Sequence, residues 1–244
     1  MSATLAVYQR GLLIVKRRVW RELLGLTISP LLYAVAFGWG LGDQVMVEGV
    51  PYLSFMLPGL IALSGMNQSF GIGTELNIAR FVNRVFEEFL LSPAGSFRIV
   101  AGNVLYGATK GLMSFVVLAL IGVSLGINPL ASPMVLVPVT LNCLMFAALG
   151  VLVALVVKTH RDMSNFSTFV ITPMAFLSNT FFSIDKLPPI LGGFARVIPL
   201  THSSIAIRGY MLGRAVPAYH LLILAVFFVV FFVLAVRQVR LAVD

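Results

Sequence analysis

The stretch ELNIARFVNRVFEEFLLSPAGSFR at positions 75–98 is a charged segment between two long apolar runs, and its charged side chains are suited to binding a partner in water. An α-helix turns by about 100° per residue, which divides the stretch into two faces. The apolar face carries Ile78, Val82, Val85, Phe86 and Phe89, and the polar face carries Arg80, Asn83, Arg84 and Glu87. The pattern predicts an amphipathic helix whose polar face contacts a partner. Arg84 and Glu88 are four residues apart and can instead pair with each other.

Motifs for catalysis and for cofactor binding are missing. GNVLYGATK at 102–110 has two glycines at the separation of a phosphate-binding loop, but Ala108 and Thr109 stand where lysine and serine or threonine should follow. The three histidines lack the spacing of a metal site, and a Gly-x-Ser-x-Gly motif is absent as well. We therefore expect no catalytic, cofactor or metal site in this chain.

The composition indicates which elements must position these charges. Hydrophobic residues make up 59% of the 244 positions and charged residues 11%, and the mean hydropathy is +0.99. A soluble domain has about 45–50% apolar and 25% charged residues. A membrane span needs about 20 apolar residues, and the sequence predicts an all-α polytopic membrane protein, a single transmembrane domain over 1–244 with six spans at 24–41, 51–73, 99–125, 134–157, 165–182 and 219–236.

Two further segments are predicted outside the spans. Residues 4–23 have the pattern of an amphipathic helix with Arg10, Arg17 and Arg21 on its polar face; this helix either lies in the membrane interface or is simply a basic lead-in that orients the first span. Residues 183–216 are too apolar for a solvated loop and too interrupted to cross the membrane. We expect two short helices broken near Pro199 that enter the membrane partway, the alternative being a plain surface loop.

The distribution of basic residues predicts the orientation. The net charge is +8, and most of the 17 lysines and arginines lie in the N-terminal segment, in 75–98, in 158–162 and at the C-terminus. The side of the membrane that carries more lysine and arginine faces the cytoplasm, so both termini and the 75–98 helix are predicted to be cytoplasmic. Because membrane topology explains the positive charge, we expect no nucleic-acid partner.

Few side chains inside the predicted spans are suited to handling a substrate. None of the spans contains Asp or Glu, and Lys110 is the basic residue that lies well inside one, where it either contacts a substrate or reaches the cytoplasmic interface. Aromatic side chains at helical spacing form faces on the first and fifth spans. They either line a substrate path or serve as packing and interface anchors; they are Tyr33, Phe37, Phe169 and Phe176.

Three stretches of the sequence resemble the ABC-2 type permease family, the membrane subunits of ATP-driven exporters, and especially the short permeases of nodulation-factor and daunorubicin export. They are FMLPGLIALSGMNQSF at 55–70, FEEFLLSPAGSFRIVAGNVLYGATKG at 86–111 and FFSIDKLPPILGGFARVIPLTH at 181–202. The resemblance implies a homodimer of six-span subunits in a bacterial inner membrane, with two copies of a cytoplasmic ABC ATPase that binds ATP and Mg. It also implies that the helix between spans two and three is a coupling helix.

In that family the coupling helix enters a cleft of the ATPase, which would make Arg80, Arg84, Glu87 and Glu88 the contact residues here. The N-terminal helix would also touch the ATPase, and substrate would pass along the subunit interface. We therefore expect the chain to export an amphiphile, such as a lipid-linked saccharide, a lipid or a hydrophobic drug. The alternatives are an ion-coupled carrier or channel that needs no ATPase, and a membrane scaffold or intramembrane enzyme.

Overall fold

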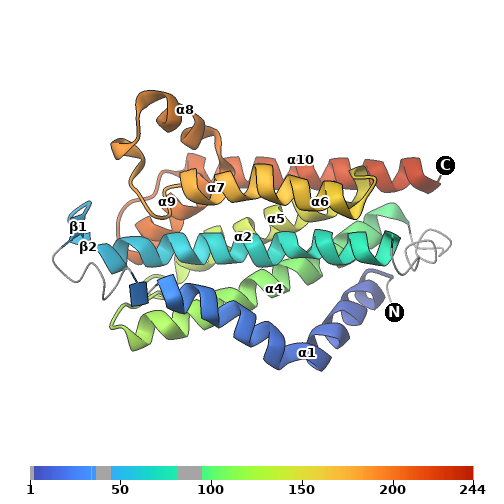
Figure 1. Cartoon of the computed structure of the whole chain (residues 1–244), viewed down its shortest axis with the longest axis horizontal. Coiled ribbons are helices and arrows are strands. Elements are labelled where there is room, and N and C mark those ends of the chain that lie inside the picture. The colour runs from blue at the N-terminus through green and yellow to red at the C-terminus, as the bar shows by residue number, and fades with distance from the viewer. Residues whose placement is uncertain (1–2, 34, 37–44, 82–94, 244) are drawn as a thin grey trace.

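A computed structural model of the chain describes residues 3–33, 35–36, 45–81 and 95–243. The protein is a bundle of helices whose long members run side by side along one axis (Figure 1). The long helices are α1 (Ala3–Tyr33), α2 (Tyr52–Phe81), α4 (Ser96–Ser124), α5 (Leu136–Val156) and α10 (Ala218–Val243). The shorter ones are η2 (Pro133–Val135), α6 (His160–Phe166), η3 (Ser167–Ile171), α7 (Thr172–Leu177), η4 (Ile184–Lys186), α8 (Pro189–Val197) and α9 (Pro199–Met211). The predicted all-helical class is confirmed at this level, with one two-stranded hairpin among the described residues, β1 (Met46–Val47) and β2 (Val50–Pro51).

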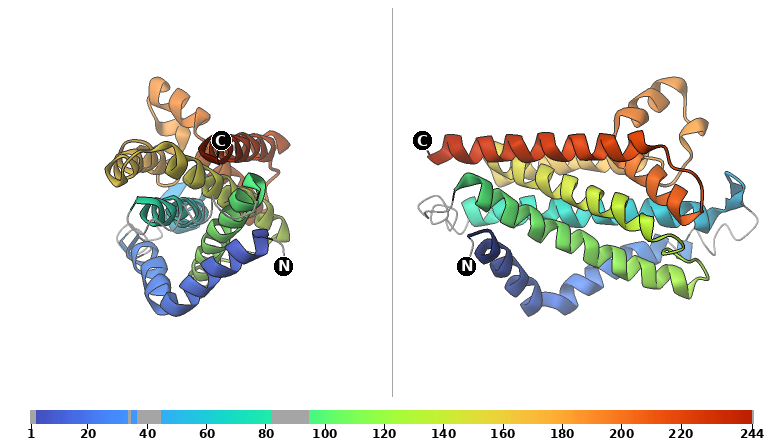
Figure 2. Two further views of the ribbon diagram at one scale, coloured as in Figure 1. Left: turned by 90° about the vertical axis from the view of Figure 1, so that its right-hand side faces the viewer. Right: turned by 180° about the vertical axis from the view of Figure 1, so that it is seen from behind.

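The bundle has two ends that are built from different elements. One end carries the β1–β2 hairpin, the α4–η2 turn and the α8–α9 segment, and we call it the hairpin end (Figure 1). The other carries both termini together with the end of α2 and the start of α4, and we call it the terminal end (Figures 1 and 2). The segments that the charge pattern assigned to one side of the membrane thus lie at the same end. That this end faces the cytoplasm stays a prediction.

Helix α2 is the central helix of the core. It packs against α4, α5 and α9, and its 30 residues extend about 45 Å at 1.5 Å per residue. Glycine lets α2 and α5 approach closely: a Cβ on Gly150 would lie 2.6 Å from the carbonyl oxygen of Phe70, and a Cβ on Gly73 would meet the carbonyl oxygen of Gly150. Cβ-less crossings of this kind are typical of tightly packed helices.

The end of α2 differs from the predicted boundary. The second span was predicted to end at residue 73, with a separate helix over 75–98, but α2 continues without a break to Phe81. The extension is stabilised by burial of Leu76, which is 6% exposed, and by contacts that Arg80 makes with α5. Residues 82–94, which include Arg84, Glu87 and Glu88, lie outside the described residues.

Three helices in the described part of the chain are long and apolar enough to cross a membrane: Ser96–Ser124, Pro133–Val156 and Tyr219–Leu241. The bent pair α8–α9 would make a fourth if it counts as one span. Helix α2 has the length, but it carries Asn67, Gln68, Glu75 and Asn77, which lower its hydropathy. Most of α2 is enclosed by other helices, so Asn77 is buried and Gln68 and Glu75 are partly buried, whereas Asn67 is exposed. The count of six spans stays a prediction.

The N-terminal part of the chain forms one helix. Residues 4–23 and a first span over 24–41 were predicted as separate segments, whereas α1 is assigned as continuous helix from Ala3 to Tyr33. The ribbon of α1 changes direction partway along, so its two arms lie at an angle to each other (Figures 1 and 2). The two arms therefore run in different directions, as expected for the two predicted segments, but no helix end lies between them.

The predicted fifth span, 165–182, is built from three helical pieces that together run from His160 to Leu177. The middle piece, η3, is π-helical and ends two residues before Pro173. A proline has no N–H to donate to the carbonyl four residues earlier, so the turn before it widens. The hydroxyl of Thr172 donates to the carbonyl of Ser167 at 3.1 Å. The helix ends five residues earlier than predicted, where Asn179 takes a positive φ of 58°.

Two short helices occupy the region where the sequence predicts a break near Pro199. Helix α8 ends at Val197 and α9 begins at Pro199, and the two are bent by 84°. Most side chains of α9 are buried against α2 and α10, whereas α8 projects from the bundle (Figure 1) and exposes Ile190, Phe194 and Val197. The depth of this segment in the membrane stays a prediction.

Candidate functional site

At the terminal end, Arg80 closes the end of α5. Its Nη1 group donates to the carbonyl oxygens of Ala154 and Leu155 at 3.2 and 2.9 Å, and lies 3.5 Å from that of Val157. The last carbonyls of a helix have no intrahelical donor, and a cation there is favoured by the helix dipole. Arg80 was predicted to contact an ATPase. Its guanidinium is instead held within the chain, and the ATPase contact stays a prediction for this residue.

Lys110 is held by a carboxylate of α2. Its Nζ lies 2.6 Å from Glu75 Oε1, and the hydroxyl of Tyr106 donates to Glu75 Oε2 at 2.9 Å. Glu75 was counted outside the spans because span two was predicted to end at residue 73. Since α2 continues past Glu75, a carboxylate lies inside the bundle and gives the buried Lys110 an ionic partner.

The basic residues of the N-terminal segment are only partly described. Arg10 is exposed and borders a small cavity of about 70 Å³ together with Glu75 and Tyr106. Arg17 and Arg21 belong to the backbone of α1, but their side chains lie outside the described residues. Of the predicted basic face of this helix, Arg10 therefore lies at the same cavity as Glu75 and Tyr106.

Two of the four aromatic residues that could line a substrate path meet the same ring. The ring centroids of Tyr33 and Phe176 lie 5.4 and 5.9 Å from that of Phe181, so Phe181 joins α1 to α7. Phe37 lies outside the described residues. Phe169, seven residues before Phe176, would share a face with it in a regular α-helix.

The π-helical turn of η3 separates these two phenylalanines. Phe169 borders an apolar groove with a cavity volume of about 550 Å³, whereas Phe176 contacts Phe181. Phe166 and Met174 also border the groove, as do Leu191, Phe194, Val197, Ile198 and Pro199 of the α8–α9 segment and Phe227 and Phe231 of α10. The groove is almost purely apolar.

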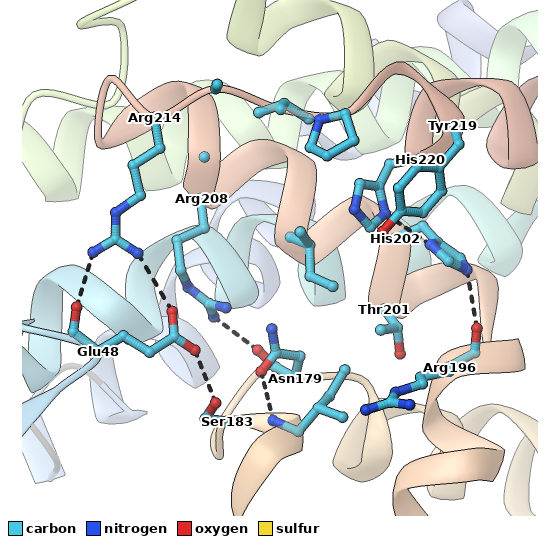
Figure 3. Close-up of a pocket in the computed structure, with 16 residues that line it drawn as sticks. Glu48, Asn179, Ser183, Arg196, Thr201, His202, Arg208, Arg214, Tyr219 and His220 are labelled. Carbon is cyan, nitrogen blue, oxygen red and sulfur yellow. Dashed lines mark hydrogen bonds and ion pairs between the residues drawn. The ribbon is translucent and has the colours of Figure 1, made fainter.

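At the hairpin end, a polar cavity of about 470 Å³ opens beside the start of α9 and α10. It is lined by side chains from four separate parts of the chain (Figure 3). We call it the cationic pocket, and its polar lining residues are Glu48, Asn179, Ser183, Arg196, Thr201, His202, Arg208, Arg214, Tyr219 and His220.

Arg208 is the deepest charge in this pocket, with 3% of its surface exposed. Its Nε donates to the carbonyl oxygen of Phe55 at 3.0 Å and its Nη2 to that of Asn179 at 2.7 Å. The guanidinium also lies over the ring of Phe55, 3.7 Å from its centroid. Neutral carbonyls and a ring stabilise this cation, and no carboxylate forms an ion pair with it within the described part of the chain.

Glu48 is positioned by the β1–β2 turn. Glu48 and Gly49 both have positive φ, 52° and 79°, as in the tight turns that match the twist of a hairpin. The carboxylate of Glu48 accepts a hydrogen bond from Ser183 at 2.8 Å and lies 3.5 Å from Arg214 Nη1. Arg214 Nη2 also donates to the backbone carbonyl of Glu48 at 2.9 Å. Glu48, the carboxylate among the described lining residues of the pocket, is therefore matched to Arg214.

Two histidines connect α9 to α10. His202 Nδ1 lies 2.9 Å from His220 Nδ1, and His202 Nε2 lies 3.0 Å from the carbonyl oxygen of Arg196. A carbonyl oxygen only accepts, so His202 carries its proton on Nε2. The neutral ring of His202 then accepts at Nδ1, and His220 donates from Nδ1. The pair is a hydrogen-bonded link between α9 and α10.

Sequence reasoning missed this pocket. Its signal was present in the sequence: Arg196, Arg208 and Arg214 all follow the fifth predicted span, on the side of the membrane that is otherwise poor in basic residues. An arginine that departs from the charge asymmetry of the loops has another role. The convergence of Glu48 with residues beyond position 179 required the tertiary structure.

Comparison with known proteins gives consistent matches along the chain. The ABC-2 type transporter family matches residues 2–212. Nodulation protein J of Rhizobium meliloti is 32% identical over 86% of this chain and 81% of its own length, and the Rhizobium leguminosarum bv. viciae protein of that name is 31% identical over 97% and 93%. An inner membrane transport permease of Escherichia coli, YadH, is 30% identical over 80% of this chain and 78% of its own.

Proposed function

The chain belongs to the ABC-2 type transporter family, and from this membership we propose that it is the permease subunit of an ATP-driven exporter. It would move an amphiphile, such as a lipid-linked saccharide, a lipid or a hydrophobic drug, across a bacterial inner membrane. Two copies of the chain and two copies of a cytoplasmic ABC ATPase would form the complex. ATP and Mg would be bound by the ATPase, since this sequence has no phosphate-binding loop.

The observation that carries the proposal is the position of the two helices between which the charged stretch lies in the sequence. The end of α2 and the start of α4 lie at the terminal end of the bundle together with both chain termini (Figure 1). A segment between α2 and α4 at that end can meet a cytoplasmic partner, and α2 and α4 continue from it into the core. Movement of the segment would therefore tilt the two helices around which the core is packed.

The coupling role is tested by reversing two charges at once, Arg84→Glu with Glu87→Arg. This double change keeps the net charge, so we expect normal insertion but loss of ATP-driven transport and of substrate-stimulated ATP hydrolysis. Lys186→Gln, an exposed change at the hairpin end, serves as the control and should leave both activities intact. Full transport by the double variant would remove the 82–94 segment from the proposed role.

An ion-coupled carrier or channel is separated from this proposal by reconstitution. Vesicles that contain this chain together with its ATPase should export only with ATP inside the compartment that holds the ATPase. Transport by the permease alone, driven by an ion gradient, would contradict the exporter proposal. Co-purification of an ATPase chain in equal numbers would support it.

A further inference from the structure

Among its described lining residues, the cationic pocket carries more positive than negative charge. Glu48 is engaged by Arg214 and Ser183, which leaves Arg208 and Arg196 without an ion pair within the part of the chain that the structure describes. Arg208 is buried, and a buried charge is costly unless it is paired. A ligand with negative charge would supply the missing counter-charge.

A second observation points to a ligand in the same pocket. Thr201 is 1% exposed and borders the cavity, yet its hydroxyl has no hydrogen-bond partner in the structure. A buried polar group without a partner is uncommon in a native protein and calls for an explanation. Thr201 also lies on the same short stretch as Arg196, on the wall opposite Arg208 and Asn179 in the close-up (Figure 3).

The α8–α9 bend borders two different cavities. Arg196 and Thr201 line the cationic pocket, while Val197, Ile198 and Pro199 between them line the apolar groove of about 550 Å³. The two cavities therefore share one wall, polar on one side and apolar on the other. A molecule with an anionic head and an apolar tail matches this pair of surfaces, because guanidinium groups bind phosphate oxygens well.

We propose that the cationic pocket and the apolar groove together bind an anionic amphiphile, with its phosphate beside Arg196, Thr201 and Arg208 and its acyl chain along the α8–α9 bend and α10. This inference rests on the proposed export function and deepens it, since it names a phosphate-bearing amphiphile as the class of substrate. The occupant is one molecule that spans both cavities.

The test is equilibrium binding to the full chain in nanodiscs of zwitterionic phosphatidylcholine. Radiolabelled dodecyl phosphate is the probe, with inorganic phosphate as the head alone and dodecyl maltoside as an uncharged amphiphile with the same tail. We expect saturable binding of dodecyl phosphate that excess dodecyl maltoside or inorganic phosphate displaces at least tenfold less effectively than unlabelled dodecyl phosphate. Equal displacement by inorganic phosphate would mean that the pocket binds free anions. Equal displacement by dodecyl maltoside would mean that the apolar groove alone accounts for binding. Either result overturns the proposal.

Three variants locate the site. Arg196→Gln removes an exposed charge and should weaken dodecyl phosphate binding about 10–100-fold, the effect of a lost charge-assisted hydrogen bond. Thr201→Val removes a hydroxyl with no protein partner, so it should weaken binding about 3–10-fold without lowering the unfolding temperature of the unliganded chain. Lys186→Gln, an exposed change at the same end, should bind as the unmodified chain does. Unchanged binding in both Arg196→Gln and Thr201→Val would overturn the proposed head position.

Binding and transport are measured separately, so that the two proposals can fail separately. If dodecyl phosphate binds as expected but no ATP-driven export of any amphiphile is observed, the site stands and the export function fails. If ATP-driven export of an uncharged amphiphile proceeds while dodecyl phosphate does not bind, the export function stands and this inference is wrong.

Discussion

Replacing Arg80 with methionine tests whether this residue stabilises the subunit or contacts a partner. The change keeps an unbranched side chain in the last turn of α2 but removes both hydrogen bonds to the end of α5. A hydrogen bond from a charged donor contributes about 1.5–3 kcal/mol, and a cation at a helix C-terminus about 0.3–1 kcal/mol. Two such bonds and the dipole contribution together amount to about 3–7 kcal/mol. Because Arg80 is half-buried, we expect a net loss of about 2–3 kcal/mol, below the low end of that range.

The chain contains its own reporter for this measurement. Cys143 is the single cysteine and is buried in α5, so a thiol-reactive fluorescent probe labels it only as the bundle opens. One kcal/mol shifts the midpoint by about 2–4 °C for a chain of this size, which predicts a decrease of about 4–12 °C for Arg80→Met. Arg80→Lys keeps the charge but loses the guanidinium geometry, and its decrease should be about 2–4 °C.

Arg161→Met is the matched control, since Arg161 is exposed at the same end of the bundle. A surface change of this kind alters stability by less than about 0.5 kcal/mol. If Arg80→Met unfolds as the Arg161→Met control does while association with the ATPase weakens, then Arg80 acts on the partner and the capping explanation is wrong.

Two further pairs of variants test the packing of the bundle by the same thiol assay. Gly73→Ala places a methyl group against the carbonyl of Gly150 and should lower the free energy of unfolding by about 1–3 kcal/mol. Gly71→Ala has open space around its Cβ and should stabilise α2 by about 0.5–1 kcal/mol. Equal effects of the two changes would mean that α2 and α5 do not cross at Gly73. Phe181→Ala removes a ring that is 6% exposed and should cost about 3–5 kcal/mol, while the same change at Phe169, 74% exposed, should alter stability by less than about 0.5 kcal/mol. Similar midpoints for the two alanine variants would contradict the burial of Phe181.

The helical class followed from the sequence because long apolar runs have few other folds available in a membrane. Element boundaries were less accurate where tertiary contacts decide them. The end of α2 depends on Arg80 meeting carbonyls 74 and 75 residues further along the chain, which no local pattern reports. The fifth span was predicted as a regular helix, and the π-helical turn before Pro173 then placed Phe169 and Phe176 on different faces.

The candidate site was the least predictable part. Lys110 was recognised as unusual, but its partner Glu75 was placed outside the span because apolar composition ends before it. The cationic pocket depends on Glu48, Asn179, Arg208 and His220 meeting in space, and these residues are separated by up to 172 positions. Charge asymmetry could have marked the arginines as exceptions, but only the packing of α9 against α2 and α10 brings them to one cavity.

The unequal burial of the long helices has a consequence for how this chain can evolve. Of an 18-residue apolar segment of α10, 17% is buried within the subunit, compared with 67% of the corresponding segment of Pro133–Val156, which includes α5. Side chains that face lipid need only be apolar, so the outer face of α10 can exchange leucine, valine and phenylalanine with little selection on shape. Gly73 and Gly150 lack this freedom, because a larger residue at either position requires the opposite helix to move. We expect sequence divergence among descendants of this chain to accumulate on α10, while the α2–α5 crossing changes only through paired substitutions.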